Sequence, residues 1–433
     1  MNDLAKMLEN DTDNVCGYIY QLLDSTAQDF LICIFKLYQH DQKNLFNLLR
    51  IWVTSVSVDV FNDDEIINLL GTLMNEHRIA PFNQSSIKYL MSKGHIYFDW
   101  YDDKIVTKPL EKNDINTELF ELWKKLLLED TNYFICSVVD KSFKLYCSIT
   151  PENLFNNRWK SDSVIVSSVV VFEKRYDLLL KWLVTLILLS KTVVEQINFV
   201  KKIIEISNKL IKMGNLQDAA AFVNCFNDKN LFNLSYLFSN LTKHEKNDLK
   251  TMKELFSENN NFVKYSEYIK DKNKIIPYIH FHLKDCETAW EYRKENLMGV
   301  GISIKKLLQY QILWLEKKPG YMMTNAISNI GFLSEKECQE MSNFWEKDQS
   351  NTSLSISTSS FETLKVRRNS LILKKKNPST SPRSRSPRSR SPRHKSPKSS
   401  PIIQRHRRKT IHFMSVSVPQ TNDDEIKLFL KKR

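Results

Sequence analysis

The sequence predicts an all-α protein, and three observations support this fold class. Only 8 glycines and 12 prolines occur among 433 residues, and most of the prolines follow residue 370, so few helix breakers interrupt the remainder. Apolar residues make up 42% of the chain, which is enough for a large core. Between residues 178 and 213, apolar side chains recur at spacings of three, four and seven, which is the pattern of an amphipathic helix.

The N-terminal part divides into three predicted segments. The polar, acidic residues 1–15 are expected to be flexible and to hold no signal peptide. Residues 16–90 show helical periodicity and form the first predicted helical domain, in which either Asn62 or Asp63 is the candidate cap of one helix. Residues 91–114 are mixed in character, and we predict a linker there, with a short hairpin as the alternative.

A second helical domain is predicted over residues 115–348. Thr150 precedes Pro151 at the start of one helix, and Pro is favoured at the first helical position. Further helices are predicted to start at Thr242, where Glu245 follows at capping-box spacing, and at Ser334. The apolar run at 178–190 is shorter than the roughly 20 residues that span a bilayer, so it is predicted to be a buried core helix.

Charge separates residues 349–433 from the rest of the chain. Residues 350–433 carry 21 lysines and arginines against 4 acidic residues, whereas the preceding residues carry 42 basic and 46 acidic groups. The Ser/Arg/Pro repeats of this tail cannot bury a core, so residues 349–433 are predicted to be disordered. The candidate phosphorylation sites are Ser370, Ser381, Ser386, Ser391, Ser396, Ser400 and Thr410.

The stretch "PYIHFHLKDCETAW" at 277–290 has the residue types of a metal site. His280 and His282 are two positions apart and would share a face on a strand, with Asp285 and Cys286 close by. Structural zinc sites need a second ligand pair, however, and the remaining histidines are remote from this one. We therefore predict a buried segment rather than a metal site, and no cofactor.

Other chemistries find little support in the sequence. The chain lacks phosphate-loop, nucleophile-elbow and HExxH patterns, and "MGVG" at 298–301 is predicted to turn one helix into the next. The seven cysteines are scattered without a CxxC pair, which is typical of reduced thiols in a cytosolic or nuclear protein. The basic tail lacks an RNA-recognition motif, so specific nucleic-acid binding is not expected, although an RNA-associated protein remains an alternative.

Six segments in order resemble the catalytic domain of Ras-family guanine-nucleotide exchange factors. The resemblance covers roughly residues 115–348, and "IYQLLDSTAQDFLICIFKLY" with "LLRIWVTSVSVDVFNDDEIINLLGTLM" in 16–90 is similar to the Ras exchanger motif that usually precedes that domain. The segments are "ITPENLFNNRW" (149–159), "YDLLLKWLV" (176–184), "VKKIIEISNKLIKMGNLQDAAAFVNCFN" (200–227), "NNFVKYSEYI" (260–269), "IPYIHFHLKD" (276–285) and "FLSEKECQEMSNFWE" (332–346).

The resemblance implies an all-helical exchange factor whose protruding helical hairpin opens the nucleotide site of a Ras-like small GTPase. By position, the first hairpin helix begins just after "HFHLKD", and the returning helix contains "ISIKKLLQYQILW". Glu287 and Glu291 take the places of the residues that crowd the magnesium and phosphate sites. The residues that correspond to GTPase-switch contacts are Phe262, Tyr278, Thr288, Trp290, Lys305 and Lys306.

The chain also departs from the family pattern. It has "GNLQ" at 214–217 for "NNFN", Ser266 for an arginine, His280 for a glycine, and "WEYR" at 290–293 for "EEGN". An inactive, GTPase-binding scaffold is therefore the main alternative to an active exchange factor. In either case we expect a cytoplasmic protein whose basic tail attracts it to the anionic inner face of the plasma membrane.

Overall fold

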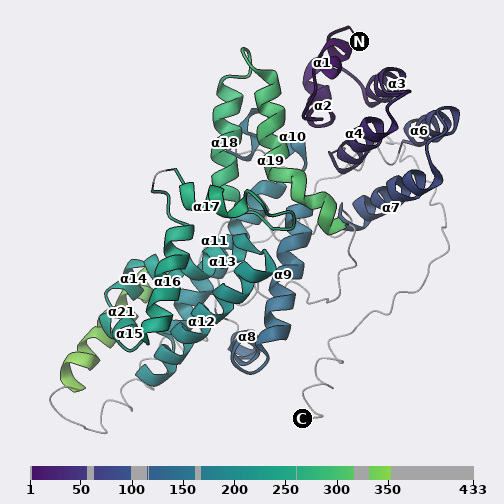
Figure 1. Ribbon diagram of the computed structural model, residues 1–433. Coiled ribbons are helices and arrows are strands. Elements are labelled where there is room, and N and C mark those ends of the chain that lie inside the picture. The colour runs from purple at the N-terminus through teal and green to yellow at the C-terminus, as the bar shows by residue number, and fades with distance from the viewer. Residues whose placement is uncertain are drawn as a thin grey trace, which may run out of the picture. The chain divides into compact units, whose positions relative to one another are not determined.

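The computed structural model describes residues 2–55, 63–98, 115, 117–160, 167–259, 261–315 and 331–352, which belong to one compact unit, residues 1–356. Within these ranges the regular structure is helical, apart from an isolated bridge between Asn215 and Ile276 (Figure 1). The predicted all-α fold is confirmed. The part of the chain that the structure describes contains no helix that is both long and apolar enough to cross a bilayer.

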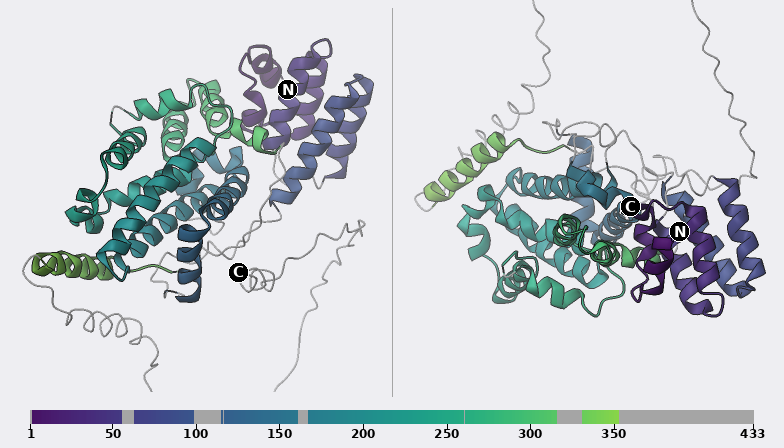
Figure 2. Two further views of the ribbon diagram at one scale, coloured as in Figure 1. Left: turned by 60° about the horizontal axis from the view of Figure 1, so that its bottom comes forward. Right: turned by 90° about the horizontal axis from the view of Figure 1, so that it is seen from above.

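The N-terminal helices pack around a core that includes Phe30 and Trp52, whose ring centroids lie 6.4 Å apart. The carboxylate of Asp63 accepts the N–H groups of Glu65 and Ile66, so the predicted cap is confirmed. Figure 2 shows these helices as one purple and blue group. They are α1 (Asn2–Glu9), α2 (Cys16–Ile19), the 3-10 helix η1 (Tyr20–Leu23), α3 (Ala27–Leu37), α4 (Gln42–Ser55), α6 (Asp64–Glu76) and α7 (Pro81–Phe98).

The prediction of a flexible segment at residues 1–15 is wrong for most of its length. Helix α1 occupies Asn2–Glu9, and Leu4 and Leu8 are buried at a spacing that puts both on one helix face. The buried carboxylate of Asp11 accepts the N–H groups of Val15 at 2.8 Å and Cys16 at 2.7 Å, which orders the turn into α2. Leu4, Met7 and Leu8 do recur at helical spacing, but the pattern extends over only eight residues and was not recognised as a helix.

Two predicted boundaries also move. Helix α7 continues through Phe98, into the range 91–114 that was predicted as a linker, because no proline interrupts it and the single Gly94 does not end it. Residues 99–114 lie outside the described part of the chain. Helix α21 (Glu335–Thr352) similarly runs past residue 348, whereas the remaining tail and all its candidate phosphorylation sites lie outside the described residues.

The larger helical region contains the segment predicted as a buried core helix, which is the second half of α11. The rings of Phe134 and Trp182 stack there at 6.1 Å. The capping box of Thr242 and Glu245 forms as predicted. Besides α21, the elements are α8 (Thr117–Glu129), α9 (Thr131–Cys147), α10 (Pro151–Leu154), η3 (Phe155–Lys160), α11 (Ser168–Leu188), α12 (Val193–Met213), α13 (Leu216–Asn224), η4 (Cys225–Asn227), α14 (Lys229–Phe232), α15 (Ser235–Ser239), α16 (Lys243–Leu255), α17 (Val263–Ile269), α18 (Ile279–Glu291) and α19 (Leu297–Leu315).

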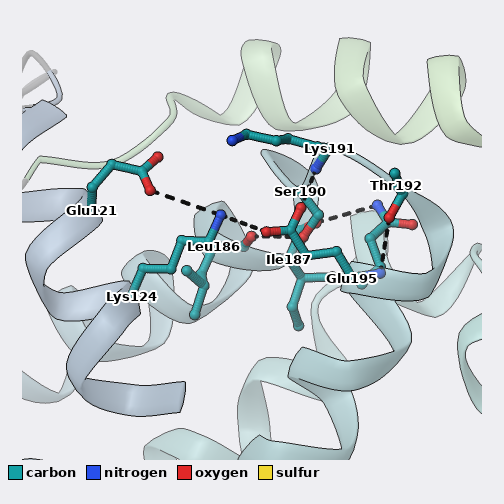
Figure 3. A network of polar contacts seen from close by, with 9 residues as sticks. Glu121, Lys124, Leu186, Ile187, Ser190, Lys191, Thr192 and Glu195 are labelled. Atoms are coloured by element: carbon teal, nitrogen blue, oxygen red, sulfur yellow. Dashed lines mark hydrogen bonds and ion pairs between the residues drawn. The ribbon is translucent and has the colours of Figure 1, made fainter. Parts of the chain in front are cut away.

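A polar network ties α8 to the start of α12 (Figure 3). The ammonium of Lys124 lies 2.5 Å from Glu195, whose other oxygen accepts the N–H of Lys191 at 2.5 Å. Thr192 caps α12 by accepting the N–H of Glu195 at 3.1 Å. Partial burial alone would raise the pKa of Glu195, but the hydrogen bonds from Lys124 and Lys191 outweigh it and lower this pKa. The network therefore links α8 to the first turn of α12 and to the residues just before it.

A second, fully buried network surrounds Asp218 in the first turn of α13. Its carboxylate accepts hydrogen bonds from Asn215 at 2.6 Å and from the hydroxyl of Ser142 on α9. The guanidinium of Arg175 on α11 lies 3.5 Å away and also donates to the carbonyl of Val138 at 3.1 Å. Three helices thus share one buried anion, and removing it would leave Arg175 without its counter-charge.

The turn between α12 and α13 binds the chain that leads into α18. The N–H of Leu216 donates to the carbonyl of Ile276 at 2.9 Å, and the N–H of Ile276 donates to the carbonyl of Gly214 at 2.7 Å. The side chain of Gln217 accepts the N–H of Ile279 at 2.9 Å. Gly214 has a φ of 84°, and an added Cβ would lie 2.4 Å from the carbonyl oxygen of Lys274, so only glycine fits this close approach.

Candidate functional site: the α18–α19 hairpin

Helices α18 and α19 run side by side and project from the body of the unit (Figure 1). The first helix begins at Ile279, earlier than the predicted start after Asp285, because Tyr278 is the last extended residue before it. Residues 298–301 lie within α19, so the turn predicted there is wrong. The turn falls at 292–296 instead, where the side chain of Asn296 accepts the N–H of Gly299 at 2.9 Å.

The two carboxylates that were predicted to act on the GTPase lie at the outer end of α18. Glu287 and Glu291 are four residues apart and therefore on the same face of the helix. Glu287 forms an ion pair with Lys160, whereas Glu291 is exposed at the last helical position. The last turn of α18 holds no basic residue, so Glu291 faces the negative end of the helix dipole, which costs about 0.3–1 kcal/mol. Helix stability therefore does not account for this glutamate.

Trp290, at the outer end of α18, contacts Phe155 of η3 and Arg293 of the turn after the helix. Its ring is stacked on Phe155 with centroids 6.3 Å apart, and the guanidinium of Arg293 lies 4.7 Å from its centroid. Its indole N–H donates to the side-chain oxygen of Asn156 at 3.2 Å. An aromatic pair contributes about 0.5–1.5 kcal/mol and a neutral hydrogen bond about as much, so these contacts restrain the end of α18.

Two consecutive left-handed residues shape the segment that reaches Trp290. Asn156 has φ 54° and ψ 28°, and Asn157 has φ 51° and ψ 35°. Asparagine tolerates this region better than most residues with a Cβ. Lys160 ends the same segment and pairs with Glu287. This pair is exposed, at 52% and 37% of the two side chains, so it contributes only about 0–1 kcal/mol.

Phe262 and Tyr278, which were predicted to line a pocket for the GTPase, do come together. Their ring centroids are 6.1 Å apart, in an aromatic cluster that also contains Tyr265 and Phe281. Phe262 is 4% and Tyr278 is 5% exposed, so little of either ring reaches the surface. The hydroxyl of Tyr265 accepts the N–H of Tyr278 at 2.7 Å, which anchors the chain just before α18.

His280 and His282 lie on a helix, where a spacing of two directs them to different faces. His280 is near Glu173, at 3.8 Å between Nε2 and Oε1, and burial lowers the pKa of its imidazole. His282 is 1% exposed, and its ring nitrogens have no hydrogen-bond partner among the described residues. Burial, with a smaller effect of the nearby Lys306, lowers the pKa of His282 to about 3. Nowhere in the described ranges do three potential metal ligands cluster.

The other predicted contact residues lie in different settings. Thr288 and Lys306 are exposed, and the hydroxyl of Thr288 donates to the carbonyl of Lys284 at 3.0 Å. Lys305 donates to the carbonyl of Asp13 at 2.6 Å, so it contacts the N-terminal helices. Gly301 lies beside Val15, whose Cβ would be 2.8 Å from an added Cβ. The N-terminal region thus supports α19 from one side. The ammonium of Lys305 is bound to Asp13 in this contact.

The contacts of Phe155, Asn156 and Lys160 were missed by sequence reasoning. These residues precede α18 by more than a hundred positions, and only the helix start of their segment was recognised. A pair of adjacent asparagines is a signal for left-handed backbone, but it does not identify the contact partner.

Replacing His282 by Phe should flatten the acid side of the stability profile. The imidazole of His282 has a pKa near 6.5 in the unfolded chain and about 3 in the folded chain. Between these two pH values the unfolded chain binds a proton that the folded chain does not bind. The free energy of unfolding therefore decreases as pH falls below 6.5. The loss is roughly 2 kcal/mol at pH 5. We expect the variant to gain about this much over the wild-type chain between pH 7.5 and 5, measured by urea unfolding. The same change at the exposed His40 should have no such effect, and an equal effect at both positions would contradict the assignment.

Comparison with known proteins shows which domain family the hairpin region is similar to. The RasGEF domain family matches residues 139–308, which include the whole of α18 and most of α19. Ras guanine nucleotide exchange factor W of Dictyostelium discoideum is 23% identical over 295 residues, which cover 62% of this chain and 24% of that protein. The Ras-specific guanine nucleotide-releasing factor RalGPS1 of Mus musculus is 23% identical over 156 residues, which cover 35% of this chain and 27% of that protein.

A third relative, Ras guanine nucleotide exchange factor K of Dictyostelium discoideum, is 25% identical over 40% of this chain and 11% of its own. The chain therefore aligns with about a quarter or less of the length of these relatives. The residues that the RasGEF family matches, 139–308, lie in the larger helical region of this chain. Residues 139–308 of this chain form a RasGEF domain, the catalytic domain type of Ras-family guanine-nucleotide exchange factors.

Proposed function

We propose that this protein promotes GDP release from a Ras-like small GTPase. The observation that carries the proposal is the RasGEF match over 139–308, because it includes a hairpin whose outer end presents exposed carboxylates. In the proposed mechanism no covalent bond is made or broken. The hairpin binds the nucleotide-free GTPase more tightly than the loaded form, and it shifts the equilibrium by that difference in binding free energy.

The residues of α18 have separate roles in this proposal. Glu291 takes the position near the phosphates of the bound nucleotide, where a negative charge repels them. Glu287 exchanges its ion pair with Lys160 for a place beside the magnesium site of the GTPase, which is feasible because the exposed pair is weak. Thr288, Trp290 and Lys306 contact the switch regions of the GTPase. Phe262 and Tyr278 support the pocket that binds its second switch region.

Removal of the Glu291 carboxylate tests the assignment. The full chain would be mixed with Ras, Rap and related GTPases carrying fluorescent GDP, and the release rate measured. We expect Glu291→Ala to slow release about tenfold, a change that corresponds to about 1.4 kcal/mol of lost transition-state stabilisation. Glu340→Ala removes an exposed carboxylate on α21 and should leave the rate unchanged. Equal rates for wild type and Glu291→Ala would refute the role of Glu291.

An inactive GTPase-binding scaffold is the second candidate function. Two observations favour it: Trp290 stands where the family has an acid, and Glu287 is already paired with Lys160. The same assay separates the two candidates. A scaffold would bind one nucleotide-free GTPase in a pull-down without accelerating GDP release from any of them, whereas an exchange factor would do both.

We further propose that the basic tail directs the protein to the anionic inner face of the plasma membrane. Each lysine or arginine near such a surface contributes roughly 1 kcal/mol, and each added phosphate brings about −1.5 to −2 charges. Replacing the five Ser-Pro serines of the tail by Glu should reduce sedimentation of the full chain with phosphatidylserine vesicles. The matched five-Ala variant should sediment like the wild type. Equal sedimentation of the Glu and Ala variants would exclude charge control at these serines, which are Ser381, Ser386, Ser391, Ser396 and Ser400.

A further inference from the structure

The segment Phe155–Lys160 contacts the outer half of α18 at three points. Phe155 is stacked on Trp290, Asn156 accepts the indole N–H at 3.2 Å, and Lys160 pairs with Glu287. All three contacts fall on the part of α18 that lies between the two carboxylates of the proposed mechanism. No resemblance or family pattern gave a role to Asn156 or Lys160.

This segment is itself fixed to the body of the domain. Phe155 is 5% and Trp159 is 7% exposed, so its apolar side chains are buried while Asn156 and Lys160 reach outward. Just before it, Glu152 accepts a hydrogen bond from Gln21 of the N-terminal helices at 3.0 Å. The segment is therefore anchored to the body of the domain, so its contacts with α18 restrain the outer end of that helix.

The left-handed backbone makes the contact specific. Asn156 and Asn157 both adopt positive φ, a conformation that costs energy for most residues with a Cβ and that asparagine tolerates better than most. Only Asn156 uses its side chain to bind the hairpin. The side-chain oxygen of Asn157 is buried and has no hydrogen-bond partner among the described residues. The two adjacent asparagines thus share a backbone state and differ in their contact with Trp290.

We propose that Phe155–Lys160 is a clamp that fixes the outer end of α18, and that Asn156 is a positioning residue for nucleotide exchange. The proposal rests on the exchange function proposed above. The stacked ring and the indole hydrogen bond provide the main restraint. The exposed pair of Lys160 and Glu287 is weak enough to be replaced by contacts to the GTPase. Asn156 acts through Trp290, so it holds Glu287 and Glu291 in place without itself touching the nucleotide.

The adjacent asparagines offer a matched pair of variants. Asn156→Gly and Asn157→Gly both keep a backbone that accepts positive φ, but only the first removes the acceptor of the Trp290 N–H. We expect Asn156→Gly to lower kcat for GDP release about fivefold, the effect of one lost hydrogen bond, with KM for the GTPase unchanged. Asn157→Gly should retain the wild-type kcat. Asn156→Asp restores an acceptor and tolerates the same backbone, so it should recover most of the rate.

A second measurement on the full chain alone separates the clamp from the exchange function. Backbone amides at 287–291 should exchange hydrogen faster in Asn156→Gly than in Asn157→Gly, without any GTPase present. Trp290→Phe keeps the stacked ring and removes the donor, so adding Asn156→Gly to it should have no further effect on these amides. Additive effects, or equal exchange in both glycine variants, would overturn the clamp. Faster amide exchange in Asn156→Gly together with a wild-type chain that releases no GDP would support the clamp and refute the proposed function.

Discussion

The hairpin depends on one buried junction, where the turn between α12 and α13 binds the chain entering α18. Two backbone hydrogen bonds join Gly214 and Leu216 to Ile276, and Gln217 holds the N–H of Ile279. All these groups are removed from water, so breaking them would leave polar groups unsatisfied at about 1–3 kcal/mol each. The base of α18 is therefore positioned by interactions that solvent does not weaken.

The outer end of the same helix is held differently. Its described contacts are an exposed ion pair, a half-buried stacked tryptophan and one hydrogen bond to Asn156. The ion pair contributes about 0–1 kcal/mol and the other two contacts about 0.5–1.5 kcal/mol each, so the outer end is restrained less firmly than the base. In the proposed exchange function, a helix that is firmly held at its base and less firmly at its outer end would adapt to the GTPase as nucleotide leaves. Asp13 and Val15, between α1 and α2, contact Lys305 and Gly301 of α19, so the N-terminal region supports the second helix of the hairpin.

Much of the fold could be predicted from the sequence because its signals are local. The caps at Asp63 and Thr242 need only a side chain and the backbone two or three residues on, and both form as predicted. The core helix at 178–190 was visible from its apolar run, which only Lys181, Thr185 and Ser190 interrupt. The family resemblance assigned the expected GTPase contacts mainly to the hairpin, and the matched region contains all of α18. The assigned roles of its residues remain predictions.

The features that sequence reasoning missed depend on contacts between distant residues. Helix α1 has only eight residues, too few to be stable alone, and burial of Leu4 and Leu8 against the rest of the fold stabilises it. His280 and His282 resemble metal ligands until the helical start at Ile279 directs them apart. Likewise, 298–301 resembles a turn because of its two glycines, yet one of them, Gly301, serves the close approach of α19 to Val15. Glycine spacing alone cannot distinguish a turn from a helix contact.

The most direct test of the account is a hydrogen-exchange footprint of a nucleotide-free Ras-like GTPase on the full chain. If the hairpin is the element that opens the nucleotide site, amides at 287–296 should become strongly protected in the complex. The protection should disappear when GTP is added and the GTPase dissociates. Protection confined to other helices, with 287–296 unchanged, would contradict the claim that α18 and its turn engage the GTPase.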